Sequence, residues 1–119
     1  MKVLLGIGGE DGALDRAIEE AARIGDDLTV AVVDSPEGDA ATEELERYVR
    51  DLVASVGVGA QIRRVPGHGG SRLVEMAEQE GFDRLVLDGG ARSPLGKVEI
   101  DEIAEFVLLN SRTSVTIVR

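Results

Sequence analysis

Residues 87–103, LDGGARSPLGKVEIDEI, contain the side-chain types that could hold a phosphate. Paired glycines, an arginine, a serine and a Gly-Lys step precede a predicted helix, and glycines let backbone amides approach an anion at a helix N-terminus. The same stretch also carries the carboxylates of Asp88, Asp101 and Glu102, which repel a phosphate. The stretch is therefore a nucleotide loop, a former nucleotide loop or an ordinary turn.

The P-loop pattern does not account for this stretch. That motif, G-x-x-x-x-G-K-[ST], surrounds phosphates with backbone amides and a lysine. If Gly96 and Lys97 form its Gly-Lys step, the motif requires a glycine at position 91 and a hydroxyl at position 98, but the sequence has Ala91 and Val98. The P-loop hypothesis fails at two required positions.

The dinucleotide fingerprint G-x-G-x-x-G fails in a similar way near the N-terminus. Gly6 and Gly8 match its first two glycines, but position 11 is Asp11, and the next glycine, Gly12, comes one residue late. We interpret these glycines as an ordinary strand-to-helix turn.

His68 is the only histidine, and the chain has no cysteine. A multi-histidine metal site, a thiolate metal site and a cysteine nucleophile are therefore excluded within one chain. His68 would need a partner nucleophile to act as a general base, and Ser71 is more simply the N-cap of the following helix. No catalytic residue and no metal ligand is predicted.

The chain is strongly acidic, with 23 Asp and Glu against 13 Lys and Arg and a formal charge of −10. Nucleic acid and anionic membranes both require a basic surface, so neither is expected as a partner. The scarcity of lysine and the abundance of acidic residues resemble the composition of proteins from salt-loving archaea. Dense surface charge is tolerated in a high-salt cytoplasm because the Debye length of the solution falls to about 3 Å at 1 M salt. A solvated acidic surface is the plainer interpretation.

The apolar runs are too short to cross a membrane, and the N-terminus lacks the layout of a signal peptide. We therefore expect a cytoplasmic protein with no membrane partner.

A chain of this length has the size of a single domain, so one domain is expected over residues 1–119. Hydrophobic periodicity predicts that strands and helices alternate along it. Apolar runs predict strands at 2–7, 28–33, 60–65, 84–88 and 114–118. Apolar residues at helical spacing predict helices between them, with stripes at Leu14, Ala17, Ile18, Ala21 and Ala22; Leu45, Tyr48, Val49, Leu52, Val53 and Val56; Leu73, Val74, Met76 and Ala77; and Ile100, Ile103, Ala104, Val107 and Leu108. The order indicates an α/β fold, a parallel sheet with helices on both faces.

In such a sheet, ligands bind beyond the carboxyl ends of the strands, where the strand order reverses. Function is therefore expected in the loops that start at Gly8, Asp34, Pro66 and Gly89. The Arg63-Arg64 pair places the third strand at a sheet edge, because charged residues protect open edges.

Three segments resemble the universal stress protein family: the opening MKVLLGI, the middle VPGHGGSRLVEMAEQEGFDRLVLDGG and the ending IAEFVLLNSRTSVTIVR. The resemblance covers essentially the whole chain. It implies a five-stranded parallel sheet of the adenine nucleotide alpha hydrolase-like type, with strand order 3-2-1-4-5. It also implies a homodimer through the last strand, at Val115, Thr116, Ile117 and Val118.

Nucleotide-binding members of that family carry G-x-x-G-x9-G-[ST] after the fourth strand. Laid on this sequence, the spacing fits without gaps, but the motif falls on Asp88, Ala91, Asp101 and Glu102. The family's usual aspartate before Gly9 is Gly8 here. The resemblance thus implies a degenerate nucleotide pocket at Gly8, Gly9, Val33, Asp88, Gly89, Ala91, Arg92, Ser93, Asp101 and Glu102.

A comparison of the attraction and the repulsion that a phosphate would meet argues against ATP binding in the manner of this family. A helix N-terminus favours an anion by roughly 0.3–1 kcal/mol. One carboxylate about 4 Å from a phosphate charge opposes it by roughly 1 kcal/mol in water and about 4 kcal/mol at an effective dielectric near 20. Molar salt would screen this repulsion, a divalent cation could bridge the two groups, and Arg92, Ser93 and Lys97 could still meet an anion.

Three functions follow from these residues. The first is a stress protein without a cofactor that does not bind ATP and acts as a homodimer through protein contacts or another small ligand. The second is a switch that binds AMP or ATP with Mg²⁺ through altered contacts. The third is metal-dependent nucleotide hydrolysis, with Asp88 and Glu102 holding the metal; we expect the protein not to be an enzyme.

Overall fold

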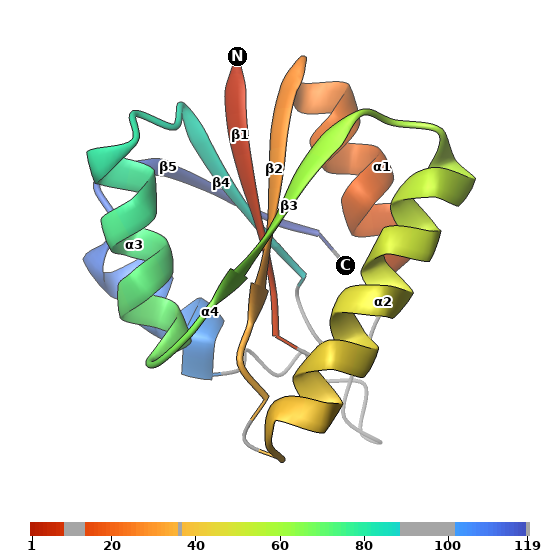
Figure 1. The fold of residues 1–119 in the computed structure, drawn as a ribbon. Coiled ribbons are helices and arrows are strands. Elements are labelled where there is room, and N and C mark those ends of the chain that lie inside the picture. The colour runs from red at the N-terminus through yellow and green to blue at the C-terminus, as the bar shows by residue number, and fades with distance from the viewer. Residues whose placement is uncertain (9–13, 36, 89–101, 119) are drawn as a thin grey trace, which may run out of the picture.

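The computed structural model describes residues 1–8, 14–35, 37–88 and 102–118 (Figure 1). Every predicted strand is present with the predicted bounds, except that the second begins one residue earlier. The elements in chain order are β1 (Lys2–Ile7), α1 (Leu14–Ile24), β2 (Asp27–Val33), α2 (Asp39–Val56), β3 (Ala60–Val65), α3 (Gly69–Gln79), β4 (Arg84–Asp88), α4 (Glu102–Asn110) and β5 (Ser114–Val118).

The five strands form one sheet in the order β3-β2-β1-β4-β5, and every neighbouring pair is parallel. The predicted fold class and strand order are confirmed. Within this sheet β3 lies at one edge and β5 at the other, so the edge position predicted from Arg63 and Arg64 is also confirmed.

Helices cover both faces of the sheet: α1 and α2 lie on one side, and α3 and α4 lie on the other (Figure 1). The central strand β1 serves both layers. Val3, Leu5 and Ile7 pack in the cluster under α1 and α2, whereas Leu4 packs under α3 and α4. Because both of its faces are covered, β1 is an unbroken apolar run rather than an alternating one.

Most described residues of the predicted helical stripes are buried or partly buried, but two are exposed. Tyr48 of α2 is 44% exposed and Leu108 of α4 is 45% exposed. Both lie at the margin of their stripe, and a helix on a sheet buries only the middle of its apolar face. The predicted stripe residue Ile100 lies outside the described residues.

The edge strand β3 is protected by its two arginines, which point to opposite faces of the sheet. Arg63 reaches the α3 side, where its Nη1 lies 2.6 Å from Glu80 Oε1, just after the end of α3. Arg64 reaches the α2 side, where it lies near Glu46 and Asp39. Each arginine thus ties the edge to the helix layer on its own side.

The Arg63–Glu80 pair should make stability depend on pH. The hydrogen bond from Arg63, followed by its charge, holds the pKa of the Glu80 carboxyl below its ordinary value of 4.5. The pair's contribution is therefore complete above that ordinary value and is lost as the pH falls through the lower pKa of the folded state. In urea titrations from pH 7 to pH 3, the unfolding free energy of the wild type should fall more steeply below pH 4.5 than that of Glu80→Gln. Parallel curves would contradict this assignment.

Candidate functional site

The ligand site predicted from the sequence corresponds to the carboxyl ends of β1, β2 and β4. Ile7 pairs with Val32, and Gly6 pairs with Leu87. The three adjacent strands therefore end on the same side of the sheet, with Gly8, Val33 and Asp88 at their carboxyl ends. The chain builds β2 and β3 on one side of β1 and β4 and β5 on the other, so the reversal of strand order falls beside β1.

A close apolar contact joins Val33 to the first residues of α3 and α4 beside these strand ends. Gly69 is buried, and a Cβ atom on it would lie 2.4 Å from Val33 Cγ1 and 3.3 Å from Ile103 Cδ1. A Cβ atom on Gly8 would lie 2.9 Å from the same Ile103 Cδ1. Ile103 therefore reaches from α4 to the end of β1 and the beginning of α3, and only glycine fits at both places without displacing it.

The next residue, Gly70, brings α3 against α4. A Cβ atom on it would lie 2.8 Å from Phe106 Cβ. The His68 and Phe106 rings pack edge to face, with ring centroids 5.1 Å apart and planes at 66°. This arrangement is a favourable geometry for an aromatic pair and fixes the His68 side chain over α4.

His68, rather than Ser71, is the N-cap of α3, so the prediction of a Ser71 cap was wrong. The Ser71 backbone N–H donates to His68 Nδ1 at 3.2 Å, and the Ser71 hydroxyl donates to the His68 carbonyl oxygen at 3.3 Å. His68 Nδ1 accepts this bond through its lone pair. Both side chains are thus used in starting the helix.

Two of the carboxylates singled out in the sequence belong to the described residues. Asp88 is half-buried at the end of β4, where it makes a further interaction within the chain, and Glu102 is the exposed first residue of α4. Glu102 and Glu105 both lie in the first turn of α4, where a negative charge interacts favourably with the helix dipole. At this helix N-terminus, the protein's own carboxylates supply the negative charge that a phosphate would bring.

The remaining predicted pocket positions, Gly9, Gly89, Ala91, Arg92, Ser93 and Asp101, lie outside the described residues. At the predicted dimer edge, Val115, Thr116 and Ile117 are half-buried and Val118 is buried.

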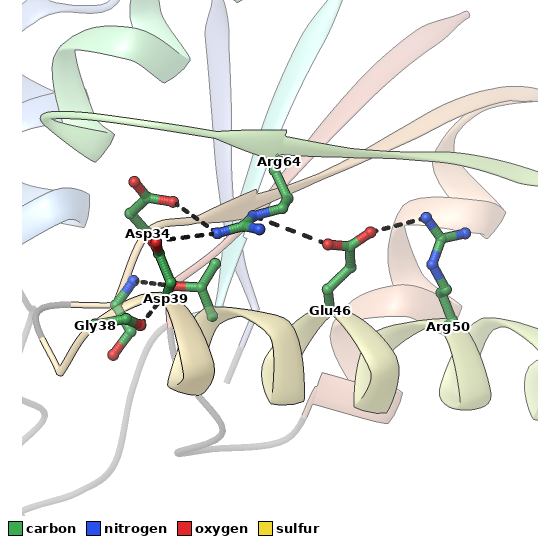
Figure 2. A network of polar contacts seen from close by, with 8 residues as sticks. Asp34, Gly38, Asp39, Glu46, Arg50 and Arg64 are labelled. Carbon is green, nitrogen blue, oxygen red and sulfur yellow. Dashed lines mark hydrogen bonds and ion pairs between the residues drawn. The ribbon is translucent and has the colours of Figure 1, made fainter.

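A network of charged side chains that the sequence did not predict lies where β2 and β3 end (Figure 2). Arg64 lies between three carboxylates: its Nη2 is 3.7 Å from both Asp34 Oδ1 and Asp39 Oδ1, and its Nε is 3.9 Å from Glu46 Oε2. Glu46 Oε1 also accepts a hydrogen bond from Arg50 at 2.8 Å. The available sequence signal was the spacing of Glu46 and Arg50, which places them on neighbouring turns of one helix face.

Within the described part of the chain, no three or more His, Asp or Glu side chains are grouped closely enough to hold a metal ion. None of the described helices combines the length and the apolar character needed to cross a lipid bilayer.

The model of the universal stress protein family matches residues 1–119. A search of curated proteins finds no match.

Solved structures agree with the family match. A universal stress protein from Archaeoglobus fulgidus is 17% identical, with 100% of this chain and 98% of that chain covered and a TM-score of 0.81. The same organism's universal stress protein in complex with dAMP is 12% identical, with 100% and 98% covered and a TM-score of 0.78. A universal stress protein in complex with cAMP is 26% identical, with 99% and 95% covered and a TM-score of 0.75.

Proposed function

Because the chain belongs to the universal stress protein family, we propose that it is a stress-response protein of a subclass that does not bind ATP in the family's manner. It acts in the cytoplasm as a homodimer, through protein contacts or a different small ligand, and it is not an enzyme. It needs no cofactor.

The observation that carries this proposal is the position of Glu102. It occupies the first turn of α4, the helix N-terminus that would otherwise receive a phosphate. A carboxylate about 4 Å from a phosphate charge opposes binding by roughly 1–4 kcal/mol, depending on exposure. The helix end contributes only about 0.3–1 kcal/mol in favour of an anion. Repulsion therefore outweighs the dipole, and Asp88 at the end of β4 adds to it.

Thermal unfolding with nucleotides tests the proposal directly. The wild type should show no rise in melting temperature with millimolar ATP and Mg²⁺, because a ligand stabilises the fold only when its concentration exceeds the dissociation constant. The variant Asp88→Gly/Glu102→Ser should bind ATP at least about tenfold more tightly than the wild type, which corresponds to about 1.4 kcal/mol of removed repulsion.

The matched control is Glu78→Ser, which removes an exposed carboxylate from α3 outside the crevice. This variant should bind ATP no better than the wild type. A clear rise in the wild-type melting temperature with ATP would refute the proposal.

A second candidate function is binding of AMP, or of ATP with Mg²⁺, through altered contacts. Two observations favour it: solved relatives are complexes with dAMP and cAMP, and an apolar contact between Val33, Gly69 and Ile103 lies beside the predicted ligand site. A monophosphate brings less charge near Glu102 than ATP does. AMP and adenosine are therefore included in the same melting series, and a rise with AMP but not with ATP would select this function.

The homodimer is supported by the contrast between the two sheet edges. The β3 edge carries Arg63 and Arg64, both ion-paired to the helix layers. The β5 sequence SVTIV contains no charged residue, and an uncharged edge is available for pairing with another strand. Two copies joined through β5 would form a closed two-fold dimer, because the charged β3 edges would not pair further.

A further inference from the structure

The loop between β2 and α2 is tied to α2 by hydrogen bonds between uncharged groups. The Ser35 backbone N–H donates to Thr42 Oγ1 at 2.9 Å, and the Thr42 hydroxyl donates to the Gly38 carbonyl oxygen at 3.2 Å. Gly38 N–H in turn donates to the Ser35 carbonyl oxygen at 3.2 Å. Thr42 is 1% exposed, and the groups in these bonds carry no charge, so the strength of the bonds depends little on salt.

At its β2 end, the loop is held partly by charge. The Asp34 backbone N–H donates to the Val65 carbonyl oxygen at 3.2 Å, which continues the β2–β3 ladder beyond the strands. The Asp34 carboxylate faces Arg64, and Figure 2 shows the Arg64 guanidinium between Asp34, Asp39 and Glu46.

The contacts of Arg64 act through space. All three distances, 3.7, 3.7 and 3.9 Å, exceed the roughly 2.7–2.9 Å of a charge-assisted hydrogen bond. Asp39 is 92% exposed and contributes little, whereas the Asp34 and Glu46 side chains are 33% and 22% exposed. Arg64 therefore joins the β2 end of the loop to β3 and α2 mainly through Asp34 and Glu46. An attraction of this kind weakens as salt is added.

We propose that Arg64 is a salt-responsive clasp on the β2–α2 loop. At low ionic strength it holds the Asp34 side chain against the end of β3, and at high ionic strength it releases that side chain, while the Thr42 bonds keep Ser35 and Gly38 tied to α2. Asp34 directly follows Val33, which packs on Gly69 at the crevice. Salt thereby controls how firmly the carboxyl end of β2 is held beside the predicted ligand site. The effect on a ligand rests on the function proposed above, whereas the clasp itself operates without one.

Amide hydrogen exchange followed by NMR, with no ligand present, tests the clasp. The KCl concentration is raised from 0.1 M to 1 M, which shortens the Debye length from about 10 Å to about 3 Å. The Asp34 amide of the wild type should then exchange about twofold to fivefold faster, the change that corresponds to an exposed ion pair. The Ser35 amide, bonded to Thr42, should change less.

Two variants separate the clasp from a general effect of salt. Arg64→Gln should give the fast Asp34 exchange already at 0.1 M KCl, with no further response to salt. Arg50→Gln removes a guanidinium from the same carboxylate of Glu46 but leaves Arg64 in place, so the salt response of Asp34 should persist. Circular dichroism at each concentration verifies that the fold is intact.

Equal salt responses in the wild type and Arg64→Gln, or no response in the wild type, would overturn the clasp. Nucleotide binding is measured separately on the same variants. If the protein binds no nucleotide but shows the Arg64-dependent salt response, this result supports the clasp. Only the proposed effect of the clasp on a ligand then loses its support.

Discussion

Gly69→Ala is expected to lower the free energy of unfolding by about 1–3 kcal/mol, the cost typical of overpacking a filled site. The new Cβ atom would lie 2.4 Å from Val33 Cγ1, whereas carbon atoms in contact lie about 3.5–4.0 Å apart. Val33 is 3% exposed and its β-branched side chain has few rotamers, so it cannot turn away freely. The overlap outweighs the 0.5–1 kcal/mol or so that alanine gains over glycine in a helix. Urea titration followed by circular dichroism measures the loss.

A second substitution tests the cause of this loss. Val33→Ala removes the atom that the new methyl group meets, so Gly69→Ala/Val33→Ala should be more stable than the sum of the two single effects predicts. Gly59→Ala is the matched control, because a Cβ atom on Gly59 meets nothing within 4 Å and should leave the free energy of unfolding nearly unchanged. Additive effects of the two single changes would show that Val33 is not the obstacle.

Ile117→Lys is expected to weaken the proposed dimer by more than about tenfold, or 1.4 kcal/mol. Ile117 is half-buried on the uncharged edge strand β5. Each copy would bring a lysine into the paired edge, where the charges repel one another and lose water. Sedimentation velocity at micromolar concentrations should show a dimer for the wild type and a monomer for the variant.

The matched control for this prediction is Ile62→Lys. Ile62 is also a half-buried isoleucine on an edge strand, but it lies on β3. Its replacement should affect folding to a comparable degree and leave the dimer intact. A monomeric wild type would contradict the dimer. Dissociation caused by Ile62→Lys but not by Ile117→Lys would show that the interface lies on β3 rather than on β5.

The strands and the sheet could be predicted from the sequence because their physical causes are local. Strands with both faces covered are continuous apolar runs, and in amphipathic helices an apolar residue recurs every three to four positions. The bounds of β1, β3, β4 and β5 follow directly from these patterns. Their regular alternation with helices predicted parallel pairing, and the charges at Arg63 and Arg64 predicted one sheet edge. The helix margins were less predictable: the stripes included Tyr48 and Leu108, whose exposure depends on how far the neighbouring layer extends.

The candidate site was only partly predictable. Parallel strands end on one side of a sheet, so Gly8, Val33 and Asp88 could be placed at adjacent strand ends, and their role as pocket positions stays a prediction. Gly69 was not singled out, since its importance arises from Val33 and Ile103, which are distant in sequence. The cap formed by His68 was missed because serine is the commoner N-cap residue.

The sequence by itself determined the alternation of strands and helices, the acidic surface and the carboxylates at Asp88 and Glu102, since these depend on residue type and short-range spacing. Only the tertiary structure decided which glycines admit no side chain and which carboxylates share Arg64. Both depend on distances of a few ångströms between elements that are far apart in the chain.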